Sequence, residues 1–196
     1  MTDSLGDFTK ERFSSGGWER DVYRRGSGPA VIVMSEVPGI TPKVAEFARM
    51  VSDRGLTAVM PHLFGEPGKE MTPAYAMGTI AKLCISKEFS GLALGHSSPV
   101  IEWLKALARQ EHERCGGPGV GAVGMCYTGG FALAMAVDDV VLAPVLSQPS
   151  LPFGVGKARK ADIGSAIDCP SCGRELTIPA RDTKAPPASL LPFLGS

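Results

Sequence analysis

The sequence predicts an α/β fold in which a mainly parallel sheet is covered by helices on both faces. Two observations support this fold class. Short, strongly apolar runs at 30–35, 56–60 and 120–125 have the length of strands that are buried on both sides. Amphipathic stretches with helix-start signals lie between these runs. Alternation of this kind is typical of parallel strands joined by right-handed crossovers.

The elements of the first half follow from local signals. An early strand is expected at 17–25, and a Gly/Pro turn separates it from the apolar strand at 30–35. Thr41 followed by a proline is a helix N-cap signal, and Gly55 is expected to end that helix. The next strand covers 56–60 and is followed by a loop rich in glycine and proline.

The second half continues the alternation as far as about residue 150. Helices are expected at 76–89 and from Ser98 to the Gly-Gly-Pro stop at 116–118. A buried strand at 120–125 precedes a short apolar helix at 129–137. One further strand, at 140–146, completes the recognisable pattern.

Periodicity is lost in the C-terminal part of the sequence. We expect an incomplete domain over residues 1–165 and a Pro-rich, poorly ordered tail over residues 166–196. The last strands and the last helix of the fold would then be missing or disordered, which would leave an exposed apolar sheet edge. The abrupt change suggests that the reading frame shifts or ends near Cys169; a soluble, cooperatively melting monomer of this length would contradict that.

Composition excludes several classes of function. The 196 residues suffice for one medium domain, with 44% hydrophobic and 20% charged residues. Basic and acidic residues number 20 each, so we expect no nucleic-acid partner and no attraction to an anionic membrane. No apolar run approaches the roughly 18 residues of a membrane span. The polar N-terminus lacks the features of a secretion signal, which favours a cytoplasmic protein.

The clearest local feature is the run GMCYTGG at 124–130, between a buried strand and an apolar helix. This is the setting of a nucleophile elbow, where a tight turn lifts the side chain of Cys126 above the sheet. The helix start favours a thiolate, and the amide of Tyr127 can face a developing oxyanion. Small neighbours permit the turn, here Gly124, Gly129 and Gly130. The alternative is a buried structural cysteine.

A carboxylate follows the most apolar strand. Glu36 lies in SEVPG at 35–39, just beyond the strand end, where α/β folds place their sites. The alternative is a solvated loop carboxylate, which is the commoner situation for a single glutamate.

Three motifs together resemble the dienelactone hydrolase family of the α/β-hydrolase superfamily. That family shows a strand ending in H-E-x-x-G, then P-x-L-[FY], then a G-x-C-x-G-G elbow. This chain has, in the same order, SEVPG at 35–39, PHLF at 61–64 and GMCYTGG at 124–130. The resemblance covers roughly residues 17–160 and implies an α/β-hydrolase that cleaves a small ester or lactone and needs no cofactor.

The resemblance also implies a role for individual residues. Cys126 would be the thiolate that attacks the carbonyl of the substrate. Glu36 would pair with the thiol in the resting enzyme and take part in its activation. The backbone amides of Val37 and Tyr127 would form the oxyanion hole.

The sequence departs from the family in its motifs and in its triad. Ser35 replaces a histidine that is not itself catalytic, and Thr128 stands where glycine is common. The base should be a histidine after the nucleophile, but all three histidines precede it: His62, His96 and His112. The acid stays unassigned, because no recognisable strand precedes the later aspartates Asp162, Asp168 and Asp182. A catalytically impaired, truncated remnant or a non-catalytic small-molecule-binding protein is therefore the alternative.

Other patterns carry less information. Cys169 and Cys172 form a lone CxxC, and since a structural zinc site needs four ligands we expect no metal. The glycines form neither GxGxxG nor a P-loop, which disfavours nucleotide binding. Family substrates carry a carboxylate, and the cations in the right part of the chain are Lys69, Lys82 and Lys87. The oligomeric state stays open.

Overall fold

The computed structural model of the chain describes residues 2–85 and 98–148. The expected tail at 166–196, with Cys169 and Cys172, lies outside the described residues. The elements are, in chain order, β1 (Thr9–Ser15), β2 (Trp18–Gly26), β3 (Ala30–Met34), α1 (Pro42–Ser52), β4 (Thr57–Pro61), α2 (Pro73–Ile85), α4 (Pro99–Cys115), β5 (Val120–Met125), a 3-10 turn (Cys126–Thr128), α5 (Gly129–Met135) and β6 (Val141–Ser147).

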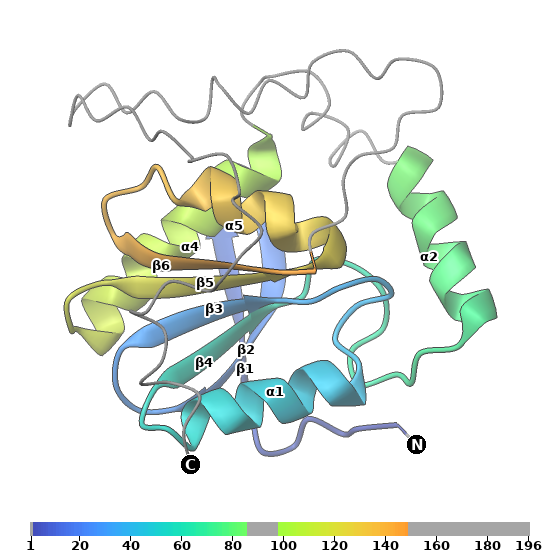
Figure 1. Cartoon of the computed structure of the whole chain (residues 1–196), viewed down its shortest axis with the longest axis horizontal. Coiled ribbons are helices and arrows are strands. Elements are labelled where there is room, and N and C mark those ends of the chain that lie inside the picture. Colours follow the sequence, from blue (N-terminus) through green and yellow to red (C-terminus); the bar gives the residue numbers. More distant parts are fainter. Residues whose placement is uncertain (1, 86–97, 149–196) are drawn as a thin grey trace, which may run out of the picture.

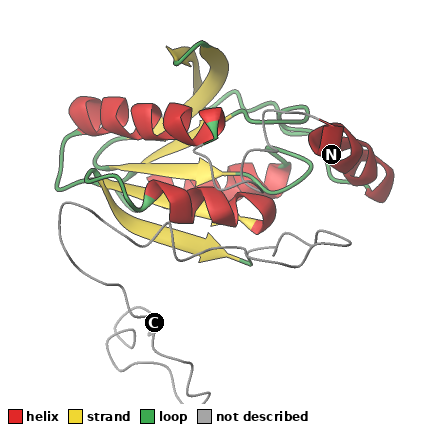
Figure 2. Ribbon diagram, turned by 90° about the horizontal axis from the view of Figure 1, so that it is seen from above, coloured by secondary structure: helices red, strands yellow, loops and turns green. Residues whose placement is uncertain are grey.

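The strands of the described residues form one sheet of six, in the order β1-β2-β4-β3-β5-β6. β3 to β6 are mutually parallel, whereas β2 is antiparallel to both of its neighbours, β1 and β4. Figure 1 shows α1 on one face of this sheet and α4 and α5 on the other. Both views place α2 to one side, away from the other helices (Figures 1 and 2). The prediction of a mainly parallel sheet with helices on both faces is confirmed.

The N-terminal hairpin is the main difference from the sequence-based expectation. β1 was not predicted, because its sequence is polar and most of it is exposed. It pairs with β2 from Thr9 opposite Arg24 to Ser15 opposite Trp18. The hairpin turns at two glycines with φ of 58° and 80°, and a tight turn of this kind joins antiparallel strands only.

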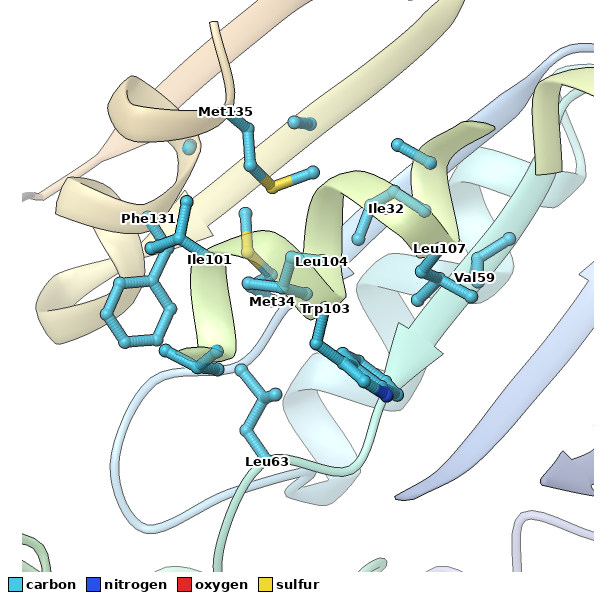
Figure 3. Packing of buried hydrophobic residues seen from close by; sticks show 14 of the residues in the cluster. Ile32, Met34, Val59, Leu63, Ile101, Trp103, Leu104, Leu107, Phe131 and Met135 are labelled. Atoms are coloured by element: carbon cyan, nitrogen blue, oxygen red, sulfur yellow. The ribbon is translucent and has the colours of Figure 1, made fainter. Parts of the chain in front are cut away.

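Two apolar layers, one on each face of the sheet, form the core. On the α4 side, Trp103, Leu104 and Leu107 are almost fully buried and pack with Ile32 and Met34 of β3 (Figure 3). On the other side, the buried face of α1 packs against β3 and β4, with Val44, Ala45, Ala48, Val33 and Met60 as members. The amphipathic periods recognised in the sequence therefore match the faces that the helices bury.

Helix ends follow the predicted signals with small shifts. The Thr41 hydroxyl accepts a hydrogen bond from the amide of Val44 at 3.4 Å and caps α1. α1 ends at Ser52, with Asp53 as C-cap, and not as late as the predicted stop, Gly55. α2 begins at Pro73, earlier than predicted, because proline suits the first turn of a helix.

One ion pair is buried beneath α4. Arg24 of β2 pairs with Glu111, whose side chain is fully buried, and it also lies 3.3 Å from Glu11 of β1. Charges removed from water cost free energy unless they are paired, so this contact fixes α4 relative to the hairpin more than it adds stability. The rings of Phe13 and Trp103, with centroids 5.2 Å apart, join the same elements.

Ion pairs and apolar contacts hold the segment before β1 against α1. Arg49 donates hydrogen bonds to Asp3 at 2.7 Å and to Asp7 at 2.7 Å, while Leu5 and Phe8 are buried in the layer on that side. The guanidinium of Arg49 holds the pKa of both carboxyl groups below their usual value. The N-terminal residues therefore belong to the folded core.

β6 is the edge of the sheet within the described residues. Leu142, Val145 and Leu146 of this strand are 58%, 48% and 40% exposed. These apolar side chains of β6 are thus exposed, and the residues from 149 on, for which missing strands were expected, lie outside the described residues. None of the described helices has the length and apolarity needed to cross a membrane.

The buried pair is testable by a double-mutant cycle. We expect Arg24→Met and Glu111→Leu each to lower the free energy of unfolding by about 3–5 kcal/mol, because each leaves a buried charge without its partner. The double substitution should cost much less than the sum, since apolar groups can fill the same space. Urea denaturation of the four proteins measures this coupling, and strictly additive losses would contradict it.

The N-terminal ion pairs predict a pH dependence. Because the folded-state pKa values of Asp3 and Asp7 are lowered, the stabilisation is fully present above the ordinary value of 3.8 and disappears as the pH falls below it. Arg49→Met should therefore lower the free energy of unfolding at neutral pH, by about 1 kcal/mol for this partly exposed network. Urea titrations should show the difference vanishing in acid, whereas the control Arg54→Met should show little difference at any pH.

Candidate active site

Cys126 lies in the turn that joins β5 to α5. β5 ends at Met125, Cys126 has φ of 52°, and a 3-10 turn leads directly into α5. A positive φ is uncommon for a residue other than glycine and marks strain that surrounding structure has to sustain. The thiol is free and partly exposed. The predicted strand, tight turn and helix are all present.

The flanking glycines differ in how strongly the turn requires them. A Cβ atom on Gly124 would overlap the backbone carbonyl of Thr128, so no larger residue fits there. A Cβ atom on Gly130 would meet nothing within 4 Å. Gly129 is buried at the first position of α5. Of Gly124 and Gly130, only Gly124 is therefore required by sterics of this kind.

The end of β3 lies beside the elbow. Met34 of β3 is in register with Gly124 of β5, and the two strands run parallel. The residues that follow Met34 therefore emerge next to those that follow Gly124. The chain turns at once, because the Gly39 amide donates to the Glu36 carbonyl at 2.8 Å. The structure thus brings Glu36 and Val37 to the same edge of the sheet as the turn at Cys126.

Two polar groups of this loop, the Glu36 carboxylate and the Val37 amide, have no partner among the described residues. The Glu36 side chain is partly buried, and within residues 2–85 and 98–148 it forms no ion pair or hydrogen bond. The Val37 amide likewise donates no hydrogen bond to any described backbone carbonyl. Tyr127 packs its ring edge-on against Phe131, with centroids 5.5 Å apart. A carboxylate and an amide donor therefore remain for a ligand.

Comparison with known proteins agrees with this geometry. A model of the dienelactone hydrolase family matches residues 22–157, more than half of the chain. The chain belongs to the dienelactone hydrolase family. No curated protein matches the sequence.

The chain is also similar to proteins of known structure. A Klebsiella pneumoniae protein provisionally named dienelactone hydrolase is 19% identical, with a TM-score of 0.53 and coverage of 75% of this chain and 62% of that one. A dienelactone hydrolase-like promiscuous phosphotriesterase from metagenomic libraries is 21% identical, with a TM-score of 0.47 and coverage of 67% and 55%. This chain thus spans less than two thirds of either relative.

The second family motif, PHLF at 61–64, supports the loop that carries Glu36. A Cβ atom on Gly65 would overlap the carbonyl of Pro38, and one on Gly39 would collide with the carbonyl of Phe64. The two loops therefore pack backbone against backbone. The His62 imidazole Nε2 lies 2.9 Å from the Gly65 carbonyl oxygen. This places His62 in the supporting loop, as a residue that orders it.

Tyr75 is a residue of this region that sequence reasoning missed. Its hydroxyl accepts a hydrogen bond from the Glu66 amide at 2.5 Å, and its ring lies 4.4 Å from the Lys69 ammonium. Lys69 also pairs with the Glu66 carboxylate at 2.9 Å, so its charge is already balanced. The sequence gives no signal for these contacts, because Tyr75 lies in a stretch that is predicted to be a loop. The Lys82 side chain and Lys87 lie outside the described structure.

The remaining candidates from the sequence are not at this edge. His112 belongs to the last turn of α4, next to Cys115, and His96 lies outside the described residues. In the part of the chain that the structure describes, no group of three or more His, Cys, Asp or Glu side chains could hold a metal ion.

The steric difference between two elbow glycines gives a matched test. Gly124→Ala should lower the free energy of unfolding by at least about 2 kcal/mol, because the added methyl group collides with backbone that cannot move away. Gly130→Ala is the control: it lies in α5 with open space around it and should be neutral or raise stability by up to about 1 kcal/mol. Urea denaturation measures both, and equal effects would disprove the tight turn.

Proposed function

We propose that this member of the dienelactone hydrolase family is a hydrolase that cleaves a small ester or lactone with Cys126 as its nucleophile. The observation that carries the proposal is the left-handed conformation of Cys126, with φ of 52°, between a buried strand and a helix. A strained turn of this kind is the setting of a nucleophile elbow. Its position beside an uncommitted carboxylate, Glu36, adds a second element of the same chemistry.

The proposed reaction has two steps. The Cys126 sulfur attacks the carbonyl carbon of the substrate while the thiol proton passes to the Glu36 carboxylate. The amides of Val37 and Tyr127 donate to the oxyanion of the tetrahedral intermediate, which is the kind of contact that contributes most to acyl transfer. The intermediate then collapses: its C–O bond breaks, the leaving oxygen takes the proton back from Glu36, and an alcohol and a thioester on Cys126 result. Water then cleaves the thioester and restores the thiol.

A second candidate function is small-molecule binding without turnover. It is favoured by the order of residues, because every histidine of the sequence precedes Cys126. Without a histidine to take its proton, a thiol is a weaker nucleophile, and water is poorly activated for the second step. A chain with this arrangement would form the acyl-enzyme slowly or simply bind the ester.

Turnover of p-nitrophenyl acetate separates the two functions. We expect slow release of p-nitrophenolate with an acetyl group detectable on Cys126 by mass spectrometry. Cys126→Ala should lower the rate of p-nitrophenolate release at least tenfold, because only binding and the oxyanion hole remain once the nucleophile is removed. The control Cys115→Ala, at the far end of α4, should retain the full rate. Equal activity of Cys126→Ala and the parent chain would refute the proposal, and binding without turnover would support the second candidate.

A further inference from the structure

Thr128 occupies the position where the resembled family commonly has glycine, and its side chain is fully buried. Its hydroxyl accepts a hydrogen bond from the Met125 amide at 2.9 Å, which closes the elbow around Cys126. A glycine at this position has no group that could make this contact. The substitution therefore adds a polar group inside the turn that carries the nucleophile.

The same hydroxyl also reaches the neighbouring strand. The oxygen lies 3.0 Å from the Met34 carbonyl and 3.2 Å from the Ser35 carbonyl, in addition to 3.0 Å from the Met125 carbonyl. A hydroxyl has one proton, so these three carbonyls share a single donated hydrogen bond. Thr128 thus connects two chain segments that are 94 residues apart in sequence.

This connection lies at the point where the sheet ceases to hold the two segments together. The last paired residues of β3 and β5 are Met34 and Gly124. Beyond these residues, the segment after β3 continues into Glu36 and Val37, and the segment after β5 continues into Cys126. Among the described residues, the Thr128 hydroxyl makes a side-chain link across this gap. This link therefore constrains the separation of the two loops.

We propose that Thr128 is a positioning residue whose hydroxyl fixes the distance between the Cys126 sulfur and the Val37 amide. This inference rests on the proposed function, because it assigns that amide to the oxyanion hole. The hydroxyl does not touch the reacting atoms. It acts by holding the donor and the nucleophile in one geometry, and a loss of such alignment reduces stabilisation of the oxyanion.

Two reactions of the same thiol distinguish alignment from general damage. Acylation by p-nitrophenyl acetate forms a C–S bond, breaks the ester C–O bond and passes through an oxyanion. Alkylation by iodoacetamide forms a C–S bond and releases iodide without an oxyanion. In Thr128→Val, which keeps the shape but removes the hydroxyl, acylation of Cys126 should fall by roughly 100-fold. Alkylation should change by less than about threefold if only the oxyanion contacts are lost.

Two control variants complete the experiment. Thr128→Ser retains the hydroxyl and should restore acylation to within about threefold of the parent rate, since the same bonds can form. Thr57→Val removes a buried hydroxyl that donates to the Gly28 carbonyl at 2.7 Å, at the opposite end of the strands. It should leave the ratio of acylation to alkylation unchanged. Parallel losses of both reactions in Thr128→Val, or no loss of either, would overturn the proposal.

Amide hydrogen exchange tests the link even if the chain does not acylate. The Met125 amide donates to Thr128, so its exchange should accelerate at least tenfold in Thr128→Val and stay slow in Thr128→Ser. Unchanged exchange in Thr128→Val would overturn the proposed link. Absence of acylation in the parent chain would refute the proposed function instead, so the two failures are distinguishable.

Discussion

The parallel pairing of β3 with β5 is the constraint on which the site depends. It places the two strand ends in register at Met34 and Gly124, and so brings Glu36 beside Cys126. Parallel neighbours deliver both carboxyl ends to one edge of the sheet, which is why α/β folds build their sites there. Without this pairing the two motifs would be distant stretches of sequence with no common function.

The elbow is sustained by the packing around it. A non-glycine residue in the left-handed region costs free energy and persists only where its surroundings over-determine it. Here Gly124 permits the close approach of the turn, and the fully buried side chains of Phe131 and Met135 fix α5 against α4 and the sheet. The strain at Cys126 is therefore supported by the apolar layer that Trp103 and Leu104 complete (Figure 3).

One charged pair is buried in this protein, while apolar side chains of the edge strand β6 are exposed. The Arg24–Glu111 pair lies inside, between the hairpin and α4, whereas Leu142 and Val145 of β6 are exposed. The sequence contained a signal for the apolar character of β6, because its run VLAPVLS is almost entirely apolar. It contained none for the buried pair, since Glu111 lies in a charged stretch, QEHER, that reads as a solvated helix end.

Local chemistry determined much of this protein. Apolar runs of strand length, Thr41 before a proline and the glycines around Cys126 define elements by short-range sterics and hydrogen bonding, which act within a few residues. Tertiary structure alone decided which segments meet. β1 joins the sheet through a hairpin because β2 offers it a partner edge, and Thr128 reaches Met34 because two strands pair in one register. Such contacts depend on the packing of the whole chain, so no local pattern encodes them.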